Sequence, residues 1–384
     1  MQNRQKRIMI LGAGQIQVPI IKKCKELNLY TIAVDYNNCA PGFEYTDLNI
    51  ILSTHDKEGV LKEAKKLNID GILTTSDFPV RTVAYVSEKL DLNGLSQKAA
   101  LISTNKYLLR EILKEKKLNY PKYVKVKDIT DLSEVDFFPA IIKPIDSSAS
   151  RGVKKVNVKE ELYSEYEISK SFSISGTVIV EEYINGKEYS IETVSTNGKH
   201  QIIAITEKIT IGKENGYFVE YSHQIPADLN KLNNELIFNT TIDALTAIEL
   251  DNSVSHTEIV ISDKKAYIIE IGARLGGDFI GSDLVCLSQG IDMLKNVISL
   301  SIGGKLDLLP KMNKFSGIQF ITPENYNTAK KFLEKKSKDI VDFELNQYRK
   351  IIIKNSLDRL GYIIFTSQTR EGLSEIFNKI NNED

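Results

Sequence analysis

The sequence has few of the features that mark secreted, membrane-spanning or zinc-stabilised proteins. Its 384 residues include three cysteines, Cys24, Cys39 and Cys286, which lie far apart and outside any Cys-x-x-Cys pattern. That spacing argues against a disulfide framework or a structural zinc site and indicates a reducing, cytosolic setting. No window approaches the roughly 18 apolar residues of a membrane span. The apolar run near the N-terminus is too short for a signal-peptide core.

Charge of either sign is not in excess. Lys+Arg 50 against Asp+Glu 51 gives a net charge of −1, so we expect no generally basic surface and no nucleic-acid partner. Histidines number only four, and we find no Ser–His–Asp or Cys–His arrangement among them. The composition is 42% hydrophobic and 26% charged, as in an ordinary soluble globular protein. The length suits two to four packed units.

The order of apolar patterns predicts two kinds of sheet. Strand and helix patterns alternate over the first hundred residues, which predicts a doubly wound parallel sheet with helices on both faces. After a helical pattern at Asn105–Lys117, short strands follow one another to about residue 275, which predicts antiparallel sheet. The last stretch, about 310–384, reads as a small α+β unit in which Gly361–Ser367 is a strand.

The first glycines resemble part of a dinucleotide-binding turn. Gly12 and Gly14 follow a strand and open a helix, and Asp35 ends the next strand. A dinucleotide fingerprint would place a third glycine where Gln17 stands. The pattern therefore favours a tight turn in a doubly wound domain, although helix N-termini also attract anions.

A loop of small residues follows an apolar strand that ends in lysine. Lys143 closes the strand Ala140–Lys143, and the segment Ile145–Val153 is rich in serine, alanine and glycine. Such a loop can bring backbone N–H groups close to a phosphate, and lysine adds a point charge. It is not a Walker A loop. A flexible surface hairpin is an equally good interpretation of this segment alone.

A second segment has the features of an adenine-binding hinge. The apolar strand Val178–Val180 leads into Glu181 and Glu182, and Asn185-Gly186 then signals a tight turn. Main-chain groups on such a segment can bind an adenine ring between apolar side chains. The alternative is a plain hairpin with exposed glutamates.

The most informative pattern is a hairpin with two glutamates. The strands His256–Ile261 and Ala266–Ile271 place Glu258 across from Glu270 if the loop has an odd number of residues, for example Asp263–Lys265. An even loop would put the two carboxylates on opposite faces. Like charges directly opposite each other destabilise a sheet, and carboxylates with substrate phosphates are a usual Mg²⁺ site.

The segment after this hairpin can serve a ligand. Arg274 can neutralise a carboxylate or a phosphoryl oxygen in a bidentate way. Gly276 and Gly277 let the backbone come close to a bound molecule. The alternative is a solvated hairpin with an arginine salt bridge.

Together these segments resemble the ATP-grasp superfamily. The ordered set is Lys106, IIKP with its small-residue loop, VEEYINGKEYS, and HTEIVI followed by YIIEIGARLGGD. Residues 1 to about 305 share the resemblance, which is greatest to carboxylate–amine ligases that join L-amino acids. It implies an N-terminal Rossmann-like domain at 1–104, a lid with the phosphate loop at 105–177 and a catalytic subdomain at 178–309. The C-terminal subdomain would cover 310–384.

The resemblance also assigns roles to single residues. It implies ATP and Mg²⁺, or Mn²⁺ in its place, as cofactors. Many members carry a metal-binding Asn where this chain has Gly272, so a second Mg²⁺ would lack that protein ligand or would be completed by water. The implied ATP-binding residues are Lys106 and Lys143 for the phosphates, Ser148, Ser150 and Gly152 for the covering loop, Glu181, Tyr183 and Ile184 for adenine, and Glu188 for ribose. The other implied groups are Glu258 and Glu270 for the metal, Arg274 and Lys143 for catalysis, and Arg274, Gly276, Gly277, His223 and His256 beside the substrates.

The implied reaction has two steps. A carboxylate attacks the γ-phosphate of ATP, and an amine then displaces phosphate from the acyl phosphate. Alternatives are a bicarbonate-dependent carboxylase on the same scaffold, a nicotinamide oxidoreductase and a non-catalytic nucleotide-binding protein. The substrates are small molecules, no membrane is involved, and a homodimer is compatible with the sequence. His223 equally fits a plain strand, and His256 equally fits support of Glu258.

Overall fold

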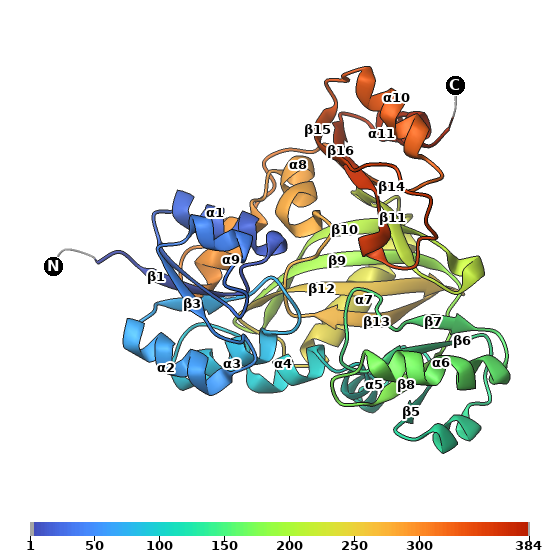
Figure 1. Ribbon diagram of the computed structural model, residues 1–384, viewed down its shortest axis with the longest axis horizontal. Helices are drawn as coiled ribbons and strands as arrows, with labels where there is room; N and C mark the ends of the chain where they lie inside the picture. Colours follow the sequence, from blue (N-terminus) through green and yellow to red (C-terminus); the bar gives the residue numbers. More distant parts are fainter. Residues whose placement is uncertain (1–3, 383–384) are drawn as a thin grey trace.

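The computed structural model describes residues 4–382, and this part of the chain forms three β-sheets with flanking helices. In Figure 1 the N-terminal sheet lies at one end of the molecule and the small β5–β8 sheet at another. A long antiparallel sheet runs between them and continues into the C-terminal part. Within residues 4–382 no helix is both long enough and apolar enough to cross a membrane.

The N-terminal unit is a four-stranded parallel sheet in the order β3-β2-β1-β4. Strands β1 and β2 are runs of buried apolar residues, as expected for a sheet covered on both faces. Figure 1 shows α1 and α9 on one face and α2 and α3 on the other. The bounds are β1 (Arg7–Leu11), α1 (Val18–Glu26), β2 (Tyr30–Asp35), β3 (Leu48–Ile51), α2 (Lys57–Leu67), β4 (Gly71–Leu73), α3 (Val80–Lys89), α4 (Gln97–Ser103) and α9 (Met293–Ser301).

The first glycines make a tight turn that the chain fills with its own side chains. Gly12 has φ +98°, a conformation that favours glycine. The Asp35 carboxylate accepts a hydrogen bond from the Ala13 N–H at 2.8 Å. Gln17 is buried beneath the turn, and its Nε2 donates to Ser76 Oγ at 2.8 Å. Asp35 and Gln17 thus serve the turn itself.

A second, four-stranded antiparallel sheet has the order β5-β8-β6-β7. Leu162 and Tyr166 of α6 are buried among its apolar side chains. Strand β8 pairs with β5 and β6 here, whereas the predicted division at residue 177 assigned it to the catalytic subdomain. The bounds are α5 (Lys106–Glu115), β5 (Tyr123–Val126), β6 (Ala140–Pro144), β7 (Lys154–Val156), α6 (Lys159–Ser171) and β8 (Val178–Glu182).

The largest sheet has eight strands in the order β13-β12-β9-β10-β11-β14-β16-β15. Its last three strands come from the predicted C-terminal unit, so that unit extends the catalytic sheet, and the predicted strand Gly361–Ser367 is β16. The bounds are β9 (Lys187–Thr196), β10 (Lys199–Ile211), β11 (Val219–Ile225), α7 (Lys231–Ala247), β12 (Ser253–Ser262), β13 (Lys265–Gly272), α8 (Val285–Gln289), β14 (Phe315–Ile321), α10 (Tyr326–Glu334), β15 (Ile340–Leu345), β16 (Gly361–Ser367) and α11 (Arg370–Asn381).

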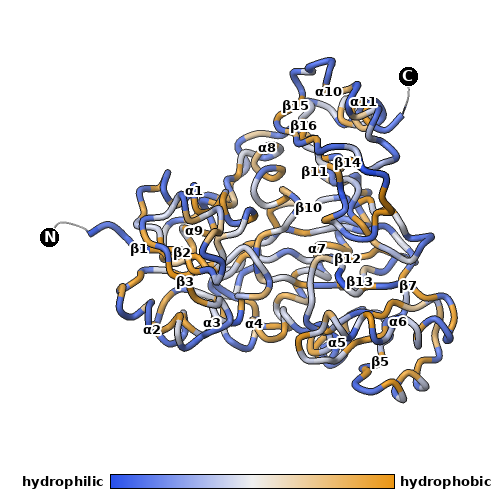
Figure 2. Tube along the Cα trace, viewed as in Figure 1, coloured by the Kyte–Doolittle hydropathy of each residue, from blue (hydrophilic) through white to orange (hydrophobic). Residues whose placement is uncertain are grey.

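One apolar core joins the N-terminal sheet to the large sheet. Met9 and Val34 of the first belong to the same buried cluster as Ile268 and Ile271 of β13. Figure 2 shows hydrophobic segments along β1 and β2 and more hydrophilic ones toward the outer loops. Because this shared core fixes the two units against each other, polar groups at their border keep a defined geometry.

Candidate active site

The two glutamates of the central hairpin face each other, but by a different route from the predicted one. The turn between β12 and β13 has two residues, Asp263 and Lys264, both with positive φ. The predicted odd loop is therefore wrong. A β-bulge between Glu258 and Ile259 shifts the register, so that Glu258 pairs with Glu270. The bulge adds one residue to β13, and this restores the two carboxylates to one face.

Each of these carboxylates has its own lysine. Lys106 Nζ lies 3.0 Å from Glu270 Oε1 and donates to the Ser147 carbonyl at 2.7 Å. Lys208 Nζ lies 2.7 Å from Glu258 Oε1 and 3.9 Å from Glu220. Burial by itself would lower the pKa of Lys208, but the glutamates around it raise that pKa, so the lysine stays charged. The lysines thus offset the repulsion that two facing carboxylates would otherwise create.

A buried charge cluster lies where adenine binding was predicted for Glu181. The Glu181 carboxylate contacts Arg110 Nε at 2.9 Å and Lys143 Nζ at 2.7 Å, and all three side chains are almost fully buried. Burial would raise the pKa of Glu181, but Arg110 and Lys143 lower it. Burial lowers the pKa of Lys143, against the effect of Glu181. The Glu181 side chain therefore orients two cations, which leaves the backbone of β8 as the part that can contact a base.

A cavity of about 150 Å³ lies between the small sheet and the large sheet. It gathers most of the residues predicted to bind a nucleotide. The residues that line it and were predicted to bind the nucleotide or the metal are Lys106, Lys143, Ser148, Ser150, Glu181, Tyr183, Ile184, Glu188, Glu258 and Glu270. Lys208, Phe218 and Glu220 also line it.

The small-residue loop is sharply turned over this cavity. Ala149 and Ser150 have φ of 58° and 55°, and Gly152 follows with +70°. A side chain on Gly152 would press against Phe172 and Pro144, so glycine suits the position. Gly152 itself does not line the cavity. Arg151 donates to the Ser148 carbonyl at 3.1 Å and lies over the Phe78 ring at 5.1 Å, so the loop also touches the N-terminal unit.

His256 links Glu258 to a buried glutamate that the sequence did not suggest. Its Nδ1 lies 2.6 Å from Glu192 Oε1, and its Nε2 lies 3.5 Å from Glu258 Oε1. Burial by itself would lower the pKa of His256, but Glu192 raises it to about 9. Glu192 also accepts the Gly276 N–H at 3.0 Å. The raised pKa favours the charged form of His256 at neutral pH, and His256 and Lys208 both approach Glu258 Oε1.

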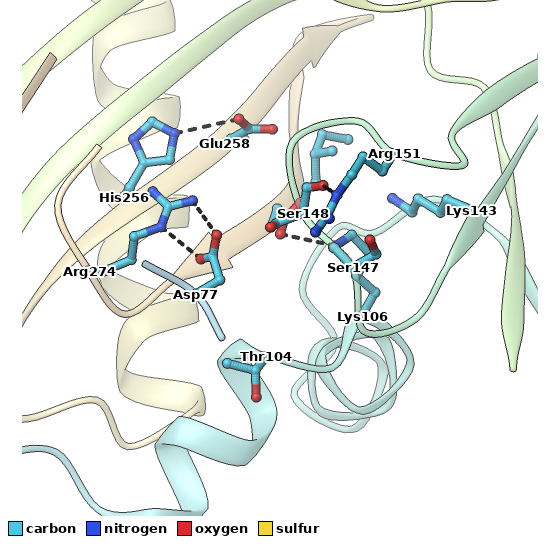
Figure 3. A network of polar contacts seen from close by, with 12 residues as sticks. Asp77, Thr104, Lys106, Lys143, Ser147, Ser148, Arg151, His256, Glu258 and Arg274 are labelled. Carbon is cyan, nitrogen blue, oxygen red and sulfur yellow. Dashed lines mark hydrogen bonds and ion pairs between the residues drawn. The ribbon is translucent and has the colours of Figure 1, made fainter. Parts of the chain in front are cut away.

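Arg274 pairs with a carboxylate of the N-terminal unit. Its Nε and Nη2 donate to the two oxygens of Asp77 at 2.7 and 2.9 Å. Figure 3 shows this pair between His256 and Lys106. Burial would raise the pKa of Asp77, but Arg274 lowers it. Gly272 leaves the room for this pair, since a Cβ there would lie 3.3 Å from Asp77 Oδ1.

His223 belongs to a third cluster, at the border with the C-terminal strands. It is 1% exposed, and its Nε2 lies 3.5 Å from Asp278. Arg359, just before β16, binds both oxygens of Asp278 at 2.9 and 2.8 Å and stacks over the Phe320 ring at 3.6 Å. This cluster anchors the C-terminal strands beside the segment that follows β13.

A second cavity adjoins the first. Both are lined by Lys106, Ser147, Ser148 and Glu270, so the two meet at the paired glutamates. The second extends along the N-terminal unit past Asp77 to α2 and α3. The five residues predicted for the substrates do not line either of these two cavities. They are Arg274, Gly276, Gly277, His223 and His256.

Several residues of the site were not found from the sequence, although some left a signal. Arg110 lies four residues after Lys106, hence on the same face of α5. Lys208 lies toward the end of an apolar strand, as Lys143 does. Asp77 follows β4, at the edge of a parallel sheet where ligands commonly bind. No sequence pattern indicated a role for Glu192, because the residues around it have the pattern of an ordinary buried strand.

The site suits a magnesium ion that is shared with a nucleotide. Among residues 4–382 no group of three or more His, Cys, Asp or Glu side chains is placed to hold a metal ion. Mg²⁺ is usually held by one or two carboxylates, and phosphates and water complete its coordination shell. Glu258 and Glu270, which face each other beside the small-residue loop, match this arrangement.

Comparisons with known proteins agree with this geometry. Residues 136–283 match the family model of the ATP-grasp domain. The solved L-amino acid ligase from Bacillus licheniformis has a similar fold, with a TM-score of 0.83 and 21% identity over 99% of this chain and 98% of that one. The fold of this chain is thus similar to that of the solved ligase. More particularly, residues 136–283 of this chain are similar to the ATP-grasp domain.

Two curated relatives are more similar in sequence. The formate-dependent phosphoribosylglycinamide formyltransferase of Prochlorococcus marinus (strain MIT 9312) is 25% identical over 67% of this chain and 69% of its own length. The alanine–anticapsin ligase of Bacillus subtilis is 26% identical over 73% of this chain and 66% of its own length. Among the curated relatives the matched share of their own length ranges from 51% to 70%.

Proposed function

We propose that this protein is an ATP-dependent carboxylate–amine ligase that forms an amide or peptide bond and releases ADP and phosphate. The observation that carries the proposal is the position of Glu258 and Glu270. They face each other where the cavity lined by the predicted nucleotide-binding residues meets a second cavity. The relatives named above support the same reaction class. We further propose a cytoplasmic protein, with a homodimer as a compatible assembly.

In this proposal the first cavity binds ATP. The backbone near Tyr183 and Ile184 contacts adenine, and Glu188 accepts from the ribose. Lys106, Lys143 and Lys208 face the phosphates, and the loop with Ser148 and Ser150 covers them. Glu258 and Glu270 hold Mg²⁺, which neutralises charge on the phosphates when bound. Since residue 272 is glycine, water or phosphate completes any second metal site.

The protein's own groups then orient the reaction. The substrate carboxylate attacks the γ-phosphate, giving an acyl phosphate and ADP, and the amine displaces phosphate. Lysines fixed by carboxylates stabilise the transferring phosphoryl group with little reorganisation. Arg274 lines neither cavity but is held by Asp77, which lines the second one, and in this proposal it reaches the acyl phosphate when the substrates are bound. The covering loop excludes water, which would hydrolyse that intermediate.

The test is a phosphate-release assay with ATP, Mg²⁺ and pairs of small carboxylates and amines, L-amino acids included. We expect phosphate release to require both substrates and to yield an amide product. Release that needs bicarbonate and no amine would instead identify a carboxylase. Absence of phosphate release with every pair, despite measured ATP binding, would contradict the proposal. A nicotinamide enzyme is disfavoured, because Asp35 and Gln17 serve the glycine turn itself.

A further inference from the structure

The acidic and basic side chains that line the second cavity differ in the partners they have within the protein. Acidic and basic side chains both line it, but the acids already have partners. Asp77 binds Arg274 through both oxygens. Asp146 accepts from Ser173 Oγ and from the backbone N–H groups of residues 174 and 175, at 2.7, 3.0 and 2.9 Å. Glu270 is paired with Lys106. Asp77 and Glu270 are therefore paired with cations, whereas Asp146 is held by neutral donors.

Two basic side chains of this cavity, Arg81 and Lys57, have no ion-pair partner among residues 4–382. Arg81 of α3 is held by Thr104, whose hydroxyl and carbonyl accept from Nε and Nη2 at 2.6 and 3.1 Å. Thr104 is neutral, and Arg81 makes no ion pair with any of residues 4–382. Lys57, at the start of α2, lies over the Tyr85 ring at 4.6 Å. Both cations line the cavity, together with His55 and Phe78.

The Arg81 side chain is exposed and is only partly covered by its neighbours. Burial lowers the pKa of Arg81, and nearby Asp146 only partly opposes this. The pKa of Arg274, in contrast, is raised, because its burial is more than offset by Asp77. The start of α5, capped by Asn105, adds positive potential near the same wall. An anion placed here would gain charge-assisted hydrogen bonds without displacing an internal partner.

We propose that the second cavity binds an amino acid whose side chain carries a negatively charged group, a carboxylate or a phosphate, in addition to the α-amino and α-carboxyl groups, and that Arg81 and Lys57 bind that side-chain group. The inference rests on the proposed ligase function. The reacting end of the substrate lies at Glu270 and Lys106, and its negatively charged end lies along α2 and α3. Phe78, between them, packs against the substrate and carries Arg151 of the phosphate loop on its ring.

The first test compares substrates that differ only in this charge. Phosphate release is measured with L-alanine as the partner of L-glutamate or L-glutamine, L-aspartate or L-asparagine, and O-phospho-L-serine or L-serine. We expect kcat/KM to be at least about tenfold higher for the charged member of one or more pairs, as for a charge-assisted contact. Preference for a carboxylate or for a phosphate distinguishes the two kinds of anion. Equal kcat/KM within all three pairs would overturn the inference while leaving the ligase proposal intact.

The second test uses variants and does not need turnover. In Arg81→Met with Lys57→Met, calorimetric binding of the preferred amino acid should weaken by about tenfold or more, and that of its neutral counterpart should change little. Lys62→Met, on the same helix as Lys57 but outside the cavity walls, is the matched control. Equal weakening for charged and neutral ligands, or none for either, would contradict the assignment. Normal binding without any phosphate release would refute the ligase function and not the anion site.

Discussion

At the scale of single residues, the site is a set of charges held by opposite charges. Lys106 and Lys208 each pair with one of the facing glutamates, and His256 also approaches Glu258. Glu258 and Glu270 are each 29% exposed, so each carboxylate stays accessible while its lysine holds it in place. The arrangement is therefore rigid, which is what electrostatic stabilisation of a transferring phosphoryl group requires.

His256 gives a prediction for pH dependence. Its pKa is raised to about 9, so the charged form is favoured in the folded protein. The resulting stabilisation, on the order of 3 kcal/mol, is complete below the unfolded pKa and is lost as pH rises through about 9. We expect the melting temperature of wild type to fall between pH 7 and pH 10 by more than that of His256→Gln.

The control for this measurement is His55→Gln, since His55 is exposed and lies outside the cluster. Parallel curves for wild type and His256→Gln would show that His256 does not carry this charge. The sequence could suggest His256 as a neighbour of Glu258, because they alternate on one strand. It could not suggest Glu192, whose importance depends on the pairing of β9 with β12.

At the scale of elements, the central hairpin shows how register decides function. The sequence predicted the two strands and the pairing of Glu258 with Glu270, but with the wrong loop. A two-residue turn alone would have placed the carboxylates on opposite faces, and the bulge corrects this. Bulges depend on contacts beyond the hairpin. Here Arg110 donates to the carbonyl of Ile269, in the bulged stretch, at 2.7 Å. No local pattern in β12 or β13 reports such a contact.

The turn can be tested by a stabilising substitution. Asp263 and Lys264 have φ of 48° and 60°, the conformation for which Asp-Gly is favoured. Lys264→Gly should therefore raise stability by roughly 0.5–1 kcal/mol and leave kcat unchanged. Thermal melts of this variant and of Lys265→Gly, within the strand, make the comparison. A loss of stability in Lys264→Gly would be inconsistent with the two-residue turn.

At the scale of the whole molecule, the site lies where three parts of the chain meet. The nucleotide cavity lies between the small and large sheets, and the second cavity extends along the N-terminal unit. The order of patterns in the sequence predicted the kinds of sheet. It did not predict that β8 joins the small sheet or that the large sheet continues into β14, β16 and β15. Strand pairing over long sequence distances depends on tertiary packing, which local patterns do not contain.

Asp77 tests the connection between the N-terminal unit and the catalytic sheet. Asp77→Asn keeps the shape but removes the charge that orients Arg274, so kcat should fall at least about tenfold while KM for ATP changes little. Arg274→Ala should lower kcat further, by about 100-fold or more. Asp56→Asn, which preserves a helix cap on the same unit, is the control. If Asp77→Asn raised only KM for ATP, the pair would serve nucleotide binding instead.

The most direct test of the central claim is the activity of Glu270→Gln, measured as Mg²⁺-dependent phosphate release with both substrates present. The substitution keeps the size of the side chain but removes the charge that faces Glu258. Asp263→Asn, in the turn of the same hairpin, is the control and should retain full activity. We predict that Glu270→Gln melts within a few degrees of wild type and loses phosphate release by at least about 100-fold. A folded Glu270→Gln protein with near-normal, Mg²⁺-dependent activity would contradict the account.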